Sequence, residues 1–198
     1  MKNNKIVLTV SLAIAMLFIF PNKVTAQRKK RIARHHVKKH HRKHIKARRR
    51  AHYRYRHLPR RGKVIRKVGV GFLGIRFRGV GYQYYKGIWY KPLGKHFVVA
   101  AAPFGIRLHV LPVGYRRFTI QNRPYFYYYG TYYVKIDSTD EYEVVQAPVG
   151  AEVDALPEGY KVLTINGADY YKLDQVYYRP RLNNDGKEYF VVVKNPAL

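Results

Sequence analysis

The chain has 198 residues, with 39 Lys and Arg against 11 Asp and Glu, and a formal net charge of +28. It contains no cysteine, which excludes disulfides and thiolate metal sites. The length suits one domain or a few small repeats, and the large positive charge bears on partners and solubility rather than on fold.

Residues 1–26 have the features of a secretory signal peptide. Two lysines precede an uncharged and almost wholly apolar stretch at 6–20, and Val24-Thr25-Ala26 supplies small residues before the expected cleavage site after Ala26. A membrane anchor is the alternative, but a helix over 6–20 rises only about 22 Å, less than the ~30 Å hydrocarbon core of a bilayer. We therefore expect an exported protein that lies in the periplasm, at the cell surface or outside the cell.

Residues 27–61 form a segment rich in Lys, Arg and His, called the basic segment below. Residues 28–61 hold 17 Lys or Arg and no acid, residues 62–135 hold 13 more and no acid, and all 11 carboxylates lie at or after Asp137. Because like charges repel one another, we expect the basic segment to be disordered or only partly helical.

Dense Lys and Arg displace counterions from a polyanion, which gives salt-dependent binding with little sequence choice. The predicted partner is an anionic envelope polymer or a membrane surface, with nucleic acid bound only non-specifically. Two alternatives remain: a solvated tail, and a segment that lies on the acidic third repeat of its own chain or of a second copy. The residues expected to bind the polyanion are Arg28, Lys29, Lys30, Arg31, Lys38, Lys39, Arg42, Lys43, Arg48, Arg49 and Arg50.

Histidines in the same segment suggest a second function. On a helix His36, His40 and His44 would share one face, and neutral imidazoles at that spacing bind Zn²⁺, Ni²⁺ or Cu²⁺. The surrounding cations and the lack of any carboxylate oppose a divalent ion. Metal binding or sequestration is therefore the alternative function.

Beyond residue 61 the sequence repeats itself. Leu111-Pro112-Val113-Gly114-Tyr115 aligns with Leu156-Pro157-Glu158-Gly159-Tyr160 at an offset of 45, and tyrosines that follow both elements keep the same offset. A degenerate first copy covers about 68–104. Such self-similarity indicates repeats, and we place them at 62–104, 105–149 and 150–198.

Each repeat has the pattern of a small β-meander of about four short strands. In the third repeat, a strand is expected at 161–165, a hairpin turn at Asn166-Gly167 and a loop at 183–186. We predict an all-β fold of two to three meander repeats, as an SH3-like small barrel or a continuous twisted sheet, preceded by a signal helix and the basic segment. A period near 45 also suits a propeller blade, but the copies are too few.

The Leu-Pro-x-Gly-Tyr elements, each followed by Tyr-Tyr pairs, resemble a secreted bacterial family of domains of unknown function. The resemblance covers about 105–196 closely and 68–104 loosely. It implies export and a β-rich repeat domain, and it implies no activity. A weaker likeness, to small periplasmic proteins linked to nickel and cobalt homeostasis, keeps metal handling open.

Aromatic residues occupy both faces of the expected strand in 124–133. One face would pack in the core, and the other would expose Tyr127 and Tyr129, or Phe126 and Tyr128, as a platform for sugars or peptide. Cross-strand aromatic packing is the favoured interpretation, because aromatic residues are ordinary in strands.

Two patterns argue against a cofactor and against catalysis. Gly69, Gly71 and Gly74 spell a dinucleotide fingerprint, but an alternating strand pattern follows them instead of a helix, so we expect a glycine-rich turn or bulge and no cofactor. In the repeats, Ser138, His96 and His109 form no recognisable catalytic motif. We therefore expect a binding or structural protein and not an enzyme.

Overall fold

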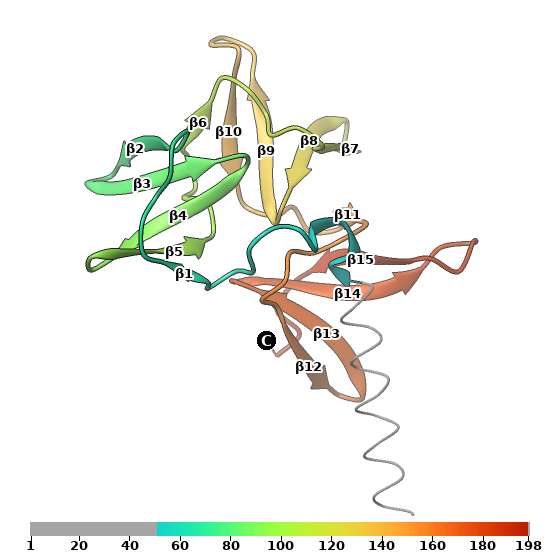
Figure 1. Ribbon diagram of the computed structural model, residues 1–198. Coiled ribbons are helices and arrows are strands. Elements are labelled where there is room, and N and C mark those ends of the chain that lie inside the picture. The colour runs from blue at the N-terminus through green and yellow to red at the C-terminus, as the bar shows by residue number, and fades with distance from the viewer. Residues whose placement is uncertain (1–50, 198) are drawn as a thin grey trace, which may run out of the picture. The chain divides into compact units, whose positions relative to one another are not determined.

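The computed structural model describes residues 51–197, which belong to one unit of the chain, Arg48–Leu198. These residues form one short 3-10 helix, η1 (Tyr53–Tyr55), and fifteen strands in three sheets (Figure 1). The prediction of an all-β fold built from meander repeats is confirmed. Within 51–197 no helix is long and apolar enough to cross a membrane.

Each sheet has five antiparallel strands, of which the last four form a meander while the first pairs with the fifth. The first sheet contains β1 (Val64–Ile65), β2 (Leu73–Phe77), β3 (Val80–Tyr85), β4 (Ile88–Leu93) and β5 (His96–Ala100). The second contains β6 (Arg107–Leu108), β7 (Arg116–Ile120), β8 (Arg123–Tyr128), β9 (Thr131–Ile136) and β10 (Glu141–Val145). The third contains β11 (Glu152–Val153), β12 (Lys161–Ile165), β13 (Ala168–Leu173), β14 (Val176–Leu182) and β15 (Glu188–Val193).

The three sheets are separate, and none closes into a barrel. The structure therefore has neither of the two forms expected from the sequence, a small barrel or one continuous sheet. The opening strand of each repeat pairs only with the fifth strand of its sheet. Because it has only two residues, it does not also reach the second strand at the opposite edge, and the sheet stays open. A strand this short has no periodicity, which explains why four strands per repeat were expected.

A shared hydrogen-bond pattern marks the start of every repeat. The N–H groups of Gly62, Gly105 and Gly150 donate to the carbonyl oxygens of Val99, Val144 and Val192, over 2.8, 2.8 and 2.9 Å. The three glycines all have positive φ, at 81°, 84° and 88°. The first repeat therefore opens in the same way as the other two, at Gly62, the first residue of the range that the sequence assigned to it.

Two-residue hairpin turns with both φ values positive connect the first three meander strands of the first and second repeats and the first two of the third, as the right-handed twist of antiparallel strands favours. Asn166-Gly167 has φ values of 50° and 75° between β12 and β13, which confirms the predicted turn. Lys86-Gly87 and Tyr129-Gly130 form the second hairpin turns of the first and second repeats.

The Leu-Pro-x-Gly-Tyr elements form turns that also join neighbouring repeats. Gly114 and Gly159 have φ values of 87° and 116°, conformations that glycine adopts without strain. Pro112 is buried against Gly87 and Pro157 against Gly130, so each proline packs on the second hairpin turn of the preceding repeat. Gly71, with a φ of 87°, takes the same place in the first repeat, which confirms a turn at the glycine-rich stretch.

Aromatic side chains dominate the core. The largest side chains that are fully buried include Trp89, Tyr127, Tyr129, Tyr132, Tyr133, Tyr178 and Phe190. Tyr127 and Tyr132 are direct partners on β8 and β9, with ring centroids 5.0 Å apart. Cross-strand aromatic packing, the favoured interpretation of the tyrosine-rich stretch, is therefore confirmed.

Candidate functional site

Residues 51–61, the last part of the basic segment, lie at the centre of the candidate site and are called the hub segment below. Ala51, Tyr55 and Arg61 are only 0%, 3% and 8% exposed. The backbone of η1 is closed by hydrogen bonds from Tyr55 N–H to the His52 carbonyl and from Leu58 N–H to the Tyr55 carbonyl, both 3.0 Å. The hub segment is therefore packed against the repeats, and through Arg54 and Arg61 it lies on the third repeat of its own chain, one of the alternatives left open for the basic segment.

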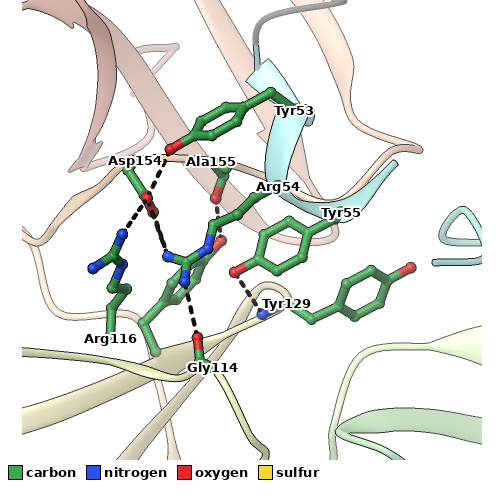
Figure 2. A network of polar contacts seen from close by, with 9 residues as sticks. Tyr53, Arg54, Tyr55, Gly114, Arg116, Tyr129, Asp154 and Ala155 are labelled. Atoms are coloured by element: carbon green, nitrogen blue, oxygen red, sulfur yellow. Dashed lines mark hydrogen bonds and ion pairs between the residues drawn. The ribbon is translucent and has the colours of Figure 1, made fainter. Parts of the chain in front are cut away.

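Asp154 in the third repeat accepts hydrogen bonds from three side chains (Figure 2). Arg54 Nη1 lies 3.1 and 3.2 Å from its two carboxylate oxygens, Tyr53 Oη lies 3.0 Å away, and Arg116 Nη2 lies 3.3 Å away. Arg54 also donates to the Gly114 carbonyl over 3.0 Å. One carboxylate thus ties the hub segment to two repeats, and its acceptor positions are occupied by structural donors.

Tyr55 lies against β8 and the turn that follows it. Its ring makes edge contacts with those of Tyr128 and Tyr129, with centroids 5.8 and 5.5 Å apart, and its hydroxyl accepts a hydrogen bond from the Tyr129 N–H over 3.1 Å. Tyr127 Oη donates over 2.8 Å to the Ala155 carbonyl of the third repeat. The hub segment and the third repeat therefore cover the tyrosines of β8.

This covering corrects the predicted aromatic platform. Tyr127 and Tyr129 are 0% and 1% exposed, and Phe126 and Tyr128 are 8% and 9% exposed. Neither face of the stretch is open to a sugar or a peptide. The sequence showed one strand with aromatic residues on both faces, but it did not show that the hub segment and another repeat would cover them.

Arg61 contacts all three sheets. Its guanidinium donates to the carbonyl of Ala100 at the end of β5 and, over 3.1 Å, to the carbonyl of Tyr129 in the second repeat. Its Nε lies 3.2 Å from Oδ2 of Asp174, in the corresponding turn of the third repeat. The Arg61 N–H donates over 2.7 Å to the Glu158 carbonyl. A buried cation is stable only when it is paired and hydrogen-bonded. The two carbonyls accept hydrogen bonds from Nη1 and Nη2, and Asp174 balances the charge, although Nε itself makes no hydrogen bond.

The sequence analysis missed these hub residues, although a weak signal was present. Tyr53 and Tyr55 are the only aromatic residues in 28–61, and Leu58 and Pro59 follow them. This change of composition sets 51–61 apart from the preceding run of Lys, Arg and His. Aromatic side chains beside a proline are more typical of a packed segment than of a solvated tail.

An open groove of about 1160 Å³ lies beside η1. Tyr53 and Arg56 line it on one side, and the loop between β14 and β15 lines it on the other. Four carboxylates face it, from Glu152, Asp154, Asp185 and Glu188. Arg56 and Lys187 also line it, so the lining has a formal net charge of −2 in a protein that carries +28.

Most of the predicted binding residues lie outside the described residues. The polyanion-binding set is Arg28, Lys29, Lys30, Arg31, Lys38, Lys39, Arg42, Lys43, Arg48, Arg49 and Arg50, and the metal set is His36, His40 and His44. Both sets stay predictions. Among residues 51–197, no group of three or more His, Cys, Asp or Glu is arranged to hold a metal ion.

The residues weighed for catalysis lie in different parts of the described chain. Ser138 is in the loop between β9 and β10, His96 begins β5, and His109 follows β6. His109 is 83% exposed at its side chain and lies 3.9 Å from Glu141. No hydrogen bond joins the serine to either histidine within the described residues, so the geometry gives no nucleophile and base pair.

Burial shifts the titration of the tyrosines. It raises the pKa of Tyr84 to about 12, and it also raises the pKa of Tyr55, Tyr127 and Tyr129. Because the ordinary tyrosine pKa is about 10, the unfolded chain releases these protons at a lower pH than the folded chain. The resulting stabilisation is complete below about pH 10 and is lost as pH rises through the raised values.

We therefore expect cooperative unfolding above about pH 10. Tyrosinate absorbance and far-UV circular dichroism, measured along one alkaline titration, should change together, because the buried tyrosines ionise only as the sheets open. Complete tyrosine ionisation with the strand signal intact would contradict this expectation.

The family model described as a family of unknown function, DUF6515, matches residues 21–195. The chain belongs to this family. The resemblance to a family of domains of unknown function is confirmed to that extent, and the DUF6515 match extends beyond the repeats to include the basic segment. No curated protein and no solved structure matches the chain significantly.

Proposed function

We propose that this DUF6515 protein is an exported, envelope-associated binding or structural protein whose basic segment contacts an anionic polymer or a membrane surface. The distribution of charge carries the proposal. No carboxylate occurs between residues 28 and 136, and the 13 Lys and Arg of 62–135 are all exposed. Both the basic segment and the first two repeats therefore carry an excess of positive charge, and charge of one sign attracts an anionic partner.

The hub residues support a binding role in preference to catalysis. Arg54, Arg61 and Asp154 are engaged in contacts that hold the repeats together, so they are not available to act on a substrate. Arg107, Arg116 and Lys135 pair with carboxylates, and the other 10 of the 13 exposed cations in 62–135 make no ion pair with a described residue and remain free to meet a partner. Export places the protein where lipopolysaccharide, anionic phospholipid and acidic polysaccharide are the polyanions at hand.

Binding to phosphatidylglycerol-containing vesicles and to lipopolysaccharide, measured over a salt series, tests the proposal. For residues 27–198 we expect log affinity to fall linearly with log salt, by at least about tenfold between about 50 and 200 mM. A matched variant should lack 28–47, because the folded unit begins at Arg48 and a deletion through 61 would remove the hub segment. Affinity that ignores salt, or that is unchanged by this deletion, would refute the proposal.

Self-association is the second candidate, and a specific observation favours it. Arg54 and Arg61 of the basic segment already pair with Asp154 and Asp174 of the third repeat. Further cations of the same segment, from this chain or from a second copy, would suit the acidic groove beside η1. Sedimentation velocity over the same salt series would detect oligomers that dissociate at high salt, and a monomer at every salt concentration would exclude them.

A further inference from the structure

The first sheet carries an unusual set of unpaired charges. Eight Lys and Arg of residues 62–100 are exposed, and that stretch contains no carboxylate. None of the eight makes an ion pair with any described residue. They are Lys63, Arg66, Lys67, Arg76, Arg78, Lys86, Lys91 and Lys95.

The second sheet has ion pairs at positions where the first sheet has none. There Arg107 on β6 lies 3.0 Å from Glu143 and 3.5 Å from Glu141, and Lys135 lies 2.7 Å from Asp140. By strand register and turn position, the first sheet has Val98 in the place of Glu143, His96 in the place of Glu141 and Lys95 in the place of Asp140. The same fold unit is therefore neutralised in one copy and left positive in the other.

Aliphatic side chains lie among these cations. Val64 on β1 and Lys91 on β4 both pair with Val98 of β5, so the three share one face, and Leu93 lies two residues beyond Lys91 on that face. Val64 is 49% exposed and Leu93 is 52% exposed. Arg66 directly follows β1 and Lys95 lies in the turn after Leu93, both exposed.

We propose that this surface, the first-sheet patch of Val64, Arg66, Lys91, Leu93 and Lys95, binds the surface of an anionic lipid bilayer. The inference rests on the proposed function for the negative charge of the partner. It adds a second contact surface, on the folded repeats, and specifies a lipid bilayer as the partner of that surface. Cations near a membrane draw anionic headgroups, and neighbouring aliphatic side chains enter the boundary with the acyl chains. A soluble polyanion would use the cations alone and gain nothing from Val64 and Leu93.

Vesicle binding of residues 27–198 tests the cations of the patch. Replacing both Arg66→Gln and Lys91→Gln is expected to weaken binding to phosphatidylglycerol vesicles by about tenfold or more. The matched control is Lys161→Gln with Lys194→Gln, two exposed lysines of the third repeat, and it should change affinity by less than about twofold. Equal losses in the two double variants would overturn the patch, because net charge alone would then explain both.

A second pair of variants separates a bilayer from a soluble polyanion. Val64→Ser with Leu93→Ser should weaken vesicle binding by about tenfold and leave heparin binding unchanged. Loss of heparin binding in the same proportion, or no loss on vesicles, would overturn the lipid assignment. Urea midpoints of all variants, measured alongside, show that each is folded.

The proposed function and the patch fail in different ways. If deletion of 28–47 abolishes binding to vesicles and the patch variants do not affect it, the proposed function holds and the patch is overturned. If the unaltered protein binds neither vesicles nor lipopolysaccharide, both are overturned.

Discussion

Arg61→Ala is expected to lower the free energy of unfolding by about 3 kcal/mol. The guanidinium of Arg61 supplies donors to the Ala100 and Tyr129 carbonyls and pairs with Asp174, so its loss leaves groups of three sheets without a partner. A buried acceptor left unsatisfied costs about 1–3 kcal/mol. Breaking a buried ion pair costs about 3–5 kcal/mol. The predicted value is at the lower end of that range because the Asp174 side chain is 30% exposed and water partly replaces the lost cation. Urea denaturation followed by circular dichroism measures the change.

Arg60→Ala is the matched control, because Arg60 is exposed and its substitution removes the same charge at the neighbouring position. It should change stability by less than about 0.5 kcal/mol. Arg61→Lys keeps the charge but loses the planar fork that reaches two carbonyls and a carboxylate, so we expect it to recover only part of the loss. Equal effects of the alanine substitutions at 60 and 61 would show that Arg61 does not join the sheets.

The two arginines also show where prediction from the sequence ended. Arg60 and Arg61 are adjacent and identical in type, and both end the basic segment, which was predicted to be disordered or only partly helical. What separates them is contact with Ala100, Tyr129 and Asp174, which lie 39, 68 and 113 residues away. Local composition carries no trace of such distant partners, so the hub segment could not be found by charge counting.

The elements that were predicted correctly have local causes. A two-residue hairpin turn needs positive φ at both positions, and Asn166-Gly167 meets that need within the sequence itself. The strands of the third repeat likewise follow from alternation between turns. The two-residue strands β1, β6 and β11 form by covering the edge of a distant strand, and two residues are too few to show an alternation by which they could be recognised.

The sequence predicts how much positive charge the repeats carry, but it does not predict which of their cations are neutralised by carboxylates. The sequence alone shows that 62–135 has 13 Lys and Arg and no acid. The structure adds that all 13 of these cations are exposed. The sheet register added that Arg107 and Lys135 are neutralised by carboxylates of their own sheet while Lys91 and Lys95 are not. The positive surface of the folded unit is therefore concentrated on the first sheet.

Gly87→Ala is expected to destabilise the protein by about 3 kcal/mol, and Gly79→Ala by only about 1 kcal/mol. The two glycines are the second residues of successive hairpin turns in the first sheet, with φ values of 83° and 78°, so the backbone penalty for alanine is the same at both. A Cβ at position 87 would lie 2.3 Å from the Tyr128 ring and 2.6 Å from Cβ of Pro112, whereas nothing lies within 4 Å of one at position 79. The difference between the variants measures the contact between the first and second repeats alone.

Thermal or urea unfolding of both variants gives the two values under one set of conditions. Gly130→Ala should also cost more than Gly79→Ala, because its Cβ would lie 2.8 Å from Leu173 and 3.0 Å from Arg61, two buried side chains that would have to shift. If alanine at 87 and at 79 cost the same, the Leu-Pro-x-Gly-Tyr proline would not pack on the preceding hairpin. The repeats would then be joined by the hub segment and not by their own turns.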